Sequence, residues 1–264
     1  MPKIKLIASD IDGTMLLEGG TSLSPEIFDY IQRLRERGIL FFAASGRPYG
    51  NLQRLFAPVK EQIGYLCENG CFSFYHDRLL HRERMDRELG QDIIRAVLQK
   101  DGAEVMVAGL MKEYIQPKDP DFYHYLNDVV DYDVEVVPDL LNIGEEYMKV
   151  SIYEKEGVGD GRYWRDLFGS RCAVVTSGRI WMDTMPHSVN KGSALARVLR
   201  ELDISPQECL AIGDNENDRE MLKLVGYPAS VQSAKPAIRA IARLETDTVG
   251  HLFQKILSGG EEGL

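Results

Sequence analysis

The sequence has few cysteines, few histidines and no long apolar run, and each shortage narrows what the protein can be. Four cysteines in 264 residues are too few and too scattered for a disulfide-stapled scaffold. Cys67 and Cys71 lie close together, but no second Cys or His cluster completes a zinc site with them. The five histidines show no metal-ligand spacing. No stretch approaches about 18 consecutive apolar residues, so the sequence predicts no membrane-spanning helix.

The chain also lacks an excess of basic residues. Asp and Glu total 41 against 31 Lys and Arg, which gives a net charge of −10. This balance argues against nucleic acid or an anionic membrane as the main partner, because both attract basic patches. The opening sequence MPKIKLIASDIDG has neither the apolar stretch nor the cleavage site of a signal peptide. We therefore expect a cytoplasmic protein whose main partner is neither nucleic acid nor a membrane. As a separate expectation, we take it to be a monomer or weak homodimer.

Strands and helices alternate in the pattern at both ends of the chain. The first part predicts strands at 4–9, 39–46 and 65–67, with helices that begin at Pro25 and Tyr49. The last part predicts a strand at 208–214 and helices at 191–202, 219–225 and 235–242, followed by a frayed tail, LSGGEEGL. Such alternation is typical of a parallel, doubly wound sheet.

The pattern changes between residues 83 and 186. This stretch predicts helices around 89–98, 122–130 and 163–168, strands at 103–109 and 149–153, and a hairpin over 172–185. Paired strands with helices between them indicate a separate α+β module. We expect an α/β fold in which 1–82 and 187–264 form a doubly wound, Rossmann-like core, and 83–186 forms an inserted α+β domain.

Three of the predicted parallel strands end in polar residues. KLIASD ends at Asp10, FFAASG contains Ser45 at its end, and CLAIGD ends at Asp214. In an open α/β sheet, ligands bind outside the carboxyl ends of the strands. Three strand ends that are distant in the sequence are therefore expected to meet at one pocket.

The chemistry of these side chains favours phosphate and a divalent cation. Asp10 and Asp214 would repel each other and raise each other's pKa, unless a hard cation such as Mg²⁺ lies between them. With the cation bound, Asp10 could attack phosphorus as a nucleophile. Asp12 could protonate the leaving oxygen and later activate water. Gly13 would permit the tight exit from the strand.

A second group of residues could hold the phosphate itself. The ammonium of Lys191 is a compact positive charge, and the Ser45 hydroxyl and Gly46 amide can donate hydrogen bonds to phosphate oxygens. For Arg47 the sequence leaves three roles open: a contact to substrate phosphate, a contact to the inserted domain, or a surface ion pair.

Four motifs together resemble those of the haloacid dehalogenase-like (HAD) phosphatase superfamily. They are DIDGT at 10–14, Ser45 in SGRP, Lys191 in NKGSAL, and GDNEND at 213–218, in that order. The insertion at 83–186 resembles the class IIB cap of the Cof-type subgroup, a cap that sets substrate specificity.

This resemblance implies a Mg²⁺-dependent phosphatase that forms an aspartyl-phosphate on Asp10. It implies a small phosphorylated metabolite as substrate, for which we favour a sugar phosphate; a phosphomutase or a non-catalytic metabolite sensor are the alternatives. The implied site residues are these: catalytic Asp10, Asp12, Ser45 and Lys191; phosphate-binding Gly46, Arg47 and Asn217; metal-binding Asp10, Asp12 (through its backbone carbonyl), Asp214 and Asp218.

Overall fold

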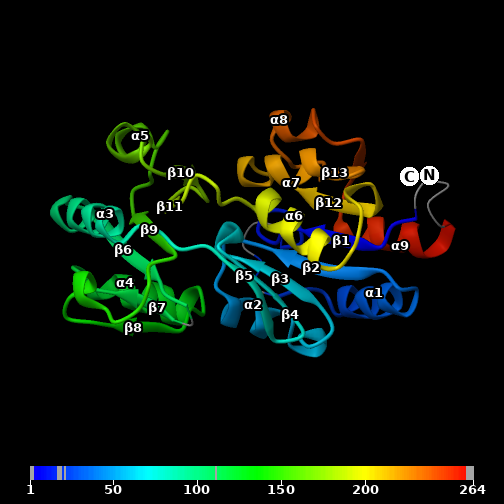
Figure 1. The fold of residues 1–264 in the computed structure, drawn as a ribbon, viewed down its shortest axis with the longest axis horizontal. Coiled ribbons are helices and arrows are strands. Elements are labelled where there is room, and N and C mark those ends of the chain that lie inside the picture. Colours follow the sequence, from blue (N-terminus) through cyan, green and yellow to red (C-terminus); the bar gives the residue numbers. More distant parts are fainter. Residues whose placement is uncertain (1–2, 17–19, 21, 111, 260–264) are drawn as a thin grey trace. The chain divides into compact units, whose positions relative to one another are not determined.

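The computed structural model describes residues 3–16, 20, 22–110 and 112–259. The chain forms two compact units (Figure 1). Unit 1 comprises Met1–Arg47, Leu52–Arg82 and Asn190–Leu264, and unit 2 comprises Pro48–Asn51 and Glu83–Val189. Each unit is built around its own sheet.

Unit 1 contains an eight-stranded sheet. Its strands are β1 (Leu6–Ser9), β2 (Leu40–Ala44), β3 (Gly64–Cys67), β4 (Phe72–Tyr75), β5 (Arg78–Arg82), β12 (Cys209–Gly213), β13 (Tyr227–Val231) and β14 (Leu244–Thr246). They are arranged in the order β14-β13-β12-β1-β2-β3-β4-β5. The pairs from β14 to β3 are parallel, and β4 and β5 extend the sheet as an antiparallel hairpin. The predicted doubly wound α/β core is confirmed.

Helices pack on this sheet through apolar stripes. In α1 that stripe is Ile27, Ile31 and Leu34, all buried. The helix packs against β2 and against α9, while α6 and α7 pack together. The helices of the sheet region are α1 (Pro25–Glu36), α2 (Tyr49–Leu55), α6 (Lys191–Glu201), α7 (Arg219–Leu224), α8 (Pro236–Arg239) and α9 (Val249–Gly259), with short 3₁₀ turns η1 (Ala57–Val59), η2 (Glu68–Gly70), η5 (Pro206–Glu208) and η6 (Glu216–Asp218).

The register of the central strands determines where the site residues lie. Ser9 of β1 is opposite Ile212 of β12 on one side and Ala43 of β2 on the other. The three strands therefore end at the same edge of the sheet. Asp10, Ser45 and Asp214 follow these ends directly, so these sequence-distant residues lie at the same edge of the sheet, as expected.

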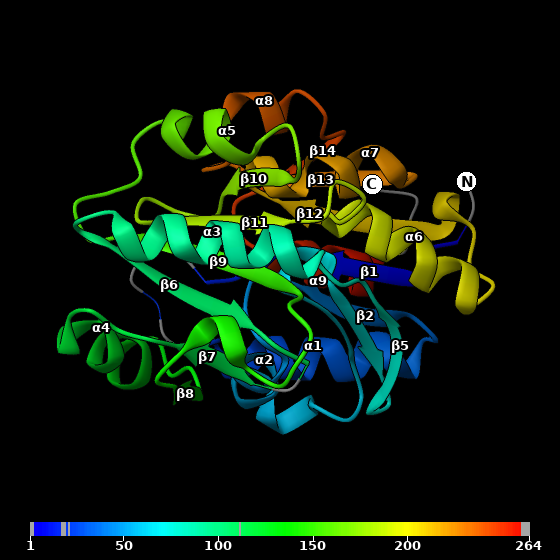
Figure 2. The same ribbon diagram turned by 60° about the vertical axis from the view of Figure 1, so that its left-hand side comes forward.

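Unit 2 contains a mixed, mainly antiparallel sheet (Figure 2). Its strands are β6 (Ala103–Ala108), β7 (Glu113–Ile115), β8 (Val134–Val136), β9 (Lys149–Glu154), β10 (Ala173–Thr176) and β11 (Trp181–Met185), in the order β10-β11-β9-β6-β7-β8. Its helices are α3 (Arg87–Gln99), α4 (Pro120–His124), the π-helical η3 (Tyr125–Val129), the 3₁₀ turn η4 (Leu140–Asn142) and α5 (Arg162–Phe168). α3 packs on β6 and β9, and α5 packs on β10, which confirms the α+β character of the insertion.

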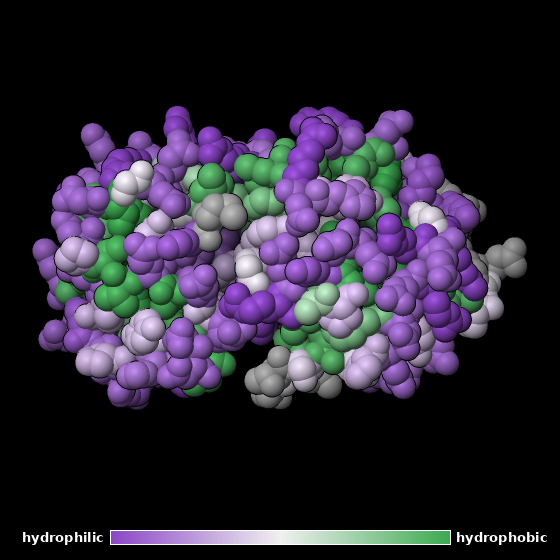
Figure 3. All heavy atoms as spheres, turned by 90° about the horizontal axis from the view of Figure 1, so that it is seen from below, coloured by the Kyte–Doolittle hydropathy of each residue, from purple (hydrophilic) through white to green (hydrophobic). Residues whose placement is uncertain are grey.

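Several elements were not expected from the sequence: β4, β5, β7, β8, β13, β14 and α9. The expected frayed tail is wrong over Leu257–Gly259, which belong to α9, and its remainder lies outside the described residues. No helix in the described part of the chain is both long and apolar enough to cross a membrane. Hydrophilic side chains predominate on the face that Figure 3 presents.

Candidate active site

The turn that follows β1 lies against the loop that carries Asp214. The backbone N–H groups of Thr14, Met15 and Leu16 all donate to the carbonyl of Ile11, which folds the chain back within a few residues. Gly13 has φ of +88°, and a Cβ there would lie 2.6 Å from Oδ2 of Asp214. Glycine is therefore required twice, for its backbone conformation and for the close approach of the carboxylate.

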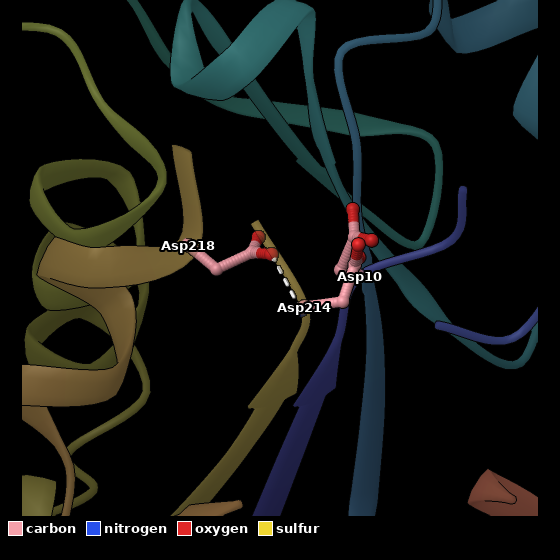
Figure 4. Close-up of side chains that lie close together, drawn as sticks. All are labelled: Asp10, Asp214 and Asp218. Atoms are coloured by element: carbon pink, nitrogen blue, oxygen red, sulfur yellow. Dashed lines mark hydrogen bonds between the residues drawn. The ribbon is translucent and has the colours of Figure 1, made fainter. Parts of the chain in front are cut away.

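Three carboxylates gather at the ends of β1 and β12. One oxygen each from Asp10, Asp214 and Asp218 lie within 4.8 Å of one another (Figure 4). Burial raises the pKa of Asp10 well above its usual value, and the neighbouring Asp218 raises it further. Burial also raises the pKa of Asp214, again with a contribution from Asp218. The cause is crowding of like charges in a poorly solvated place.

Lys191 is the cation within this cluster. Its Nζ donates to Oδ1 of Asp10 at 2.5 Å and to Oδ1 of Asp218 at 2.6 Å, and its side chain is fully buried. Burial on its own lowers the pKa of Lys191, but the two carboxylates outweigh that effect and the pKa is raised. A capping box between Asn190 and Ser193 fixes the start of α6 and thereby the position of the lysine.

Asp218 orients its neighbours. While Oδ1 accepts from Lys191, its Oδ2 accepts from the backbone N–H groups of Asp214 and Asn215, both at 3.0 Å. The bond from Asn215 lies within the turn that carries Asp214. The Asp214 carboxylate also accepts from the Thr14 hydroxyl at 2.8 Å. Both oxygens of Asp218 thus have protein donors, which suits a supporting group better than a direct metal ligand.

Asp12 lies apart from the carboxylate cluster. Its side chain is half exposed and is held by Arg47, whose Nη2 lies 2.6 Å from Oδ1 and whose Nε lies 2.9 Å from Oδ2. This bidentate geometry orients the carboxylate. Of the three roles that the sequence left open for Arg47, the structure shows an ion pair, and the pair is with an expected catalytic residue.

The expected phosphate-binding residues lie on neighbouring turns of unit 1. Ser45 is fully buried, and its Oγ accepts from the backbone N–H of Arg47 at 3.2 Å. Nδ2 of Asn217 donates to Oδ1 of Asn69 at 3.0 Å. Neither Asn69 nor Thr14 was predicted from the sequence as a site residue.

The donor set fits a divalent metal ion. With three carboxylates and one lysine, the cluster carries a surplus of negative charge, and Asp218 adds to the rise that burial causes in the pKa of Asp10 and Asp214. Carboxylate oxygens are hard ligands of the kind that Mg²⁺ prefers. The Asp12 carboxylate, bound to Arg47, does not belong to this set.

Comparison with known proteins agrees with the motifs and the fold. The family model described as haloacid dehalogenase-like hydrolase matches residues 7–250. The chain belongs to the haloacid dehalogenase-like hydrolases. An HMP-PP phosphatase of Serratia proteamaculans is 26% identical to this HAD hydrolase over 258 residues, which cover 96% of the chain and 93% of that protein. A 5-amino-6-(5-phospho-D-ribitylamino)uracil phosphatase of Escherichia coli is 23% identical over 91% of the chain and 89% of that protein.

Solved structures of similar fold cover nearly the whole HAD hydrolase. A protein of Streptococcus mutans has a TM-score of 0.85 and 26% identity, over 97% of this chain and 99% of that one. A HAD subclass IIB sugar phosphatase has a TM-score of 0.83 and 17% identity, over 96% and 98%. The expected resemblance to HAD phosphatases is confirmed by the family model and by relatives that are themselves phosphatases, and the fold is that of a subclass IIB sugar phosphatase.

Proposed function

We propose that the protein is a Mg²⁺-dependent phosphomonoester hydrolase that acts on a small phosphorylated metabolite through an aspartyl-phosphate on Asp10. The observation that carries this proposal is the Asp10–Lys191–Asp218 contact beside Asp214, at the ends of two parallel strands. It combines a buried carboxylate, a fixed cation and a further carboxylate within one small volume.

In the proposed reaction, an oxygen of Asp10 attacks phosphorus and the bond from phosphorus to the ester oxygen breaks. Asp12, in its protonated form, gives its proton to that oxygen as the alcohol leaves. In the second half, Asp12 takes a proton from water as the water oxygen attacks phosphorus, and the bond from phosphorus to Asp10 breaks. Inorganic phosphate is released and both aspartates return to their starting states.

Asp10, Asp214 and the backbone carbonyl of Asp12 would hold the metal ion, with Asp218 supporting them. When bound, Mg²⁺ supplies the positive charge that keeps these carboxylates ionised and offsets the charge of the phosphate. Lys191 contributes a fixed positive charge from the protein itself, in direct contact with the nucleophile.

We propose that the Ser45 hydroxyl, the Gly46 amide, Asn217 and Lys191 bind the phosphoryl oxygens. We also propose that Arg47, which holds Asp12 through Nε and Nη2, contacts the phosphate, because its positive charge suits an anion. In that arrangement Arg47 would hold the acid–base group and touch the phosphate at once.

The substrate class follows from the relatives. The HMP-PP phosphatase and the 5-amino-6-(5-phospho-D-ribitylamino)uracil phosphatase act on small phosphorylated metabolites, and the subclass IIB neighbour is a sugar phosphatase. We propose a substrate of this class for the present chain and favour a sugar phosphate. We further propose that residues 83–186 act as the cap that selects it, in a protein that is a monomer or weak homodimer.

The test is phosphate release from a panel of phosphorylated sugars, nucleotides and cofactors, with Mg²⁺ and again with EDTA. We expect release that requires Mg²⁺ and is lost in Asp10→Asn. Asp203→Asn is the matched control, since Asp203 is exposed and has φ of 53°, which asparagine tolerates. An active Asp10→Asn protein would exclude the covalent route, and an isomer without free phosphate would indicate a mutase.

A further inference from the structure

The turn after β3 has an unusual backbone. Glu68, Asn69 and Gly70 have φ of 52°, 55° and 104°, so three successive residues adopt the left-handed region. Asparagine tolerates this region moderately, whereas glutamate does not. Glu68 and Asn69 are nevertheless buried. Strain of this kind persists only where the surroundings hold the chain in place, and it is common beside functional sites.

The surroundings of this turn are the expected phosphate-binding segments. The N–H of Asn69 donates to the carbonyl of Ser45 at 3.0 Å, and the N–H of Glu68 donates to the carbonyl of Arg47 at 3.2 Å. A Cβ on Gly70 would lie 2.5 Å from the carbonyl oxygen of Asn190, the residue before Lys191. The turn therefore packs closely on two segments that are far apart in the sequence.

The side chain of Asn69 adds a third connection. Its Oδ1 accepts from Nδ2 of Asn217 at 3.0 Å. Its Nδ2 lies 3.1 Å from the position that a Cβ would take on Gly46. The Asn69 amide thus lies against Gly46, whose N–H is expected to face the phosphate. The same amide contacts Asn217, which is expected to bind the phosphate. Asn69 itself is only 2% exposed.

We propose that Asn69 is a positioning residue for the phosphate: it sets the spacing between the Ser45–Gly46 turn and Asn217. This inference rests on the proposed function, which supplies the phosphate-binding role of those neighbours. The Asn69 amide fits this position because its oxygen accepts the hydrogen bond from Asn217 while its nitrogen faces Gly46. An aspartate could accept the same bond, but it would put a negative charge beside the phosphate.

The test uses two substitutions that separate the side chain from the backbone. Asn69→Gly removes the amide and is compatible with φ of 55°, so we expect the backbone of the turn to be preserved. Asp203→Gly is the control, because Asp203 has φ of 53° in the same unit and is exposed. Asn69→Asp keeps the acceptor for Asn217 and adds charge.

We expect Asn69→Gly to weaken orthophosphate binding, measured by calorimetry in Mg²⁺, by about tenfold or more, with a parallel fall in kcat/KM. Asn69→Asp should weaken orthophosphate binding further and raise KM more than it lowers kcat, since its charge repels the phosphate. Asp203→Gly should leave both quantities unchanged. In Asn69→Gly, a second change, Asn217→Ala, should cost less than it does alone, since the two amides act through one contact.

Wild-type affinity in Asn69→Gly, or losses that follow a lowered melting temperature, would overturn the inference. Full additivity with Asn217→Ala would overturn it as well. These outcomes are distinct from a failure of the proposed function, which would appear as absence of Mg²⁺-dependent phosphate release by the wild type. Orthophosphate binding is measured without turnover, so the role of Asn69 is tested in either case.

Discussion

Replacing Lys191 with methionine should strongly destabilise unit 1. The substitution preserves most of the side-chain volume but leaves Asp10 and Asp218, both within 2.6 Å of Nζ, without their buried cation. Removing one partner of a buried ion pair costs about 3–5 kcal/mol. At about 2–4 °C per kcal/mol for a protein of this size, the unfolding midpoint should fall by about 6–20 °C.

The destabilisation should depend on pH. Burial raises the pKa of Asp10 first and Asp218 raises it next, whereas Lys191 opposes the rise. Without the lysine, the folded-state pKa of Asp10 rises further above its unfolded value of about 4. A raised carboxyl pKa leaves stability intact below the unfolded pKa and reduces it as pH rises through the folded one. The difference between variant and wild type should therefore be largest near neutral pH and should shrink toward pH 4.

The two tryptophans allow unfolding of unit 2 to be followed separately. Trp164 and Trp181 both belong to unit 2, so tryptophan fluorescence follows that unit, whereas far-UV circular dichroism follows both. In EDTA, Lys191→Met should shift the dichroism transition more than the fluorescence transition. Lys223→Met is the control, because Lys223 forms an exposed pair with Glu220 that is worth about 0–1 kcal/mol. Equal, small shifts for both variants at neutral pH would refute the reasoning.

Three further predictions concern the turn at Gly13, the buried ion pair of unit 2 and the binding of Mg²⁺. Gly13→Ala should lower kcat/KM by about a hundredfold, because the new methyl displaces the Asp214 carboxylate, and kinetics with a folded variant checks this. Lys149→Met should lower the fluorescence midpoint of unit 2, since Lys149 and Asp183 form a buried pair at 3.3 Å whose loss costs about 3–5 kcal/mol. Mg²⁺ at about 100 times its dissociation constant should stabilise the wild type by about 2.7 kcal/mol in a thermal melt, relative to EDTA.

The sequence predicts the central strands well because they are continuous apolar runs, and it misses strands whose signals are weak. β13 contains Pro228, which removes a ladder donor and is typical of turns, yet the strand is accommodated beside β12. The β4–β5 hairpin turns at His76 and Asp77, with φ of 51° and 54°. The usual Asn-Gly or Asp-Gly signal of such a turn is missing.

The helix α9 is a different case, since its signal was present. Leu252, Phe253, Ile256 and Leu257 recur on one helical face and are buried. The glycine-rich residues that follow them favoured the interpretation as a frayed tail. The helical repeat of apolar residues therefore predicts this element better than the composition of the terminus does.

In the site, the sequence identifies the groups but not their pairings. The strand ends predict that Asp10, Ser45 and Asp214 meet, because parallel strands in register end at one edge. The fork between Asp12 and Arg47 and the bond between Asn69 and Asn217 join residues 35 and 148 positions apart. No local pattern encodes such contacts, since they depend on how separate turns pack once the sheet has formed.

The charges of the site link the binding of cation and phosphate. Asp10, Asp214 and Asp218 outnumber Lys191, and Asp218 raises the pKa of the first two beyond the rise that burial causes. A phosphate monoester brings about two more negative charges to this place. It should therefore bind weakly until a divalent cation is present, and by linkage the phosphate must tighten the cation by the same factor. If both ligands bind here as proposed, the surplus of acid at the strand ends would couple their binding.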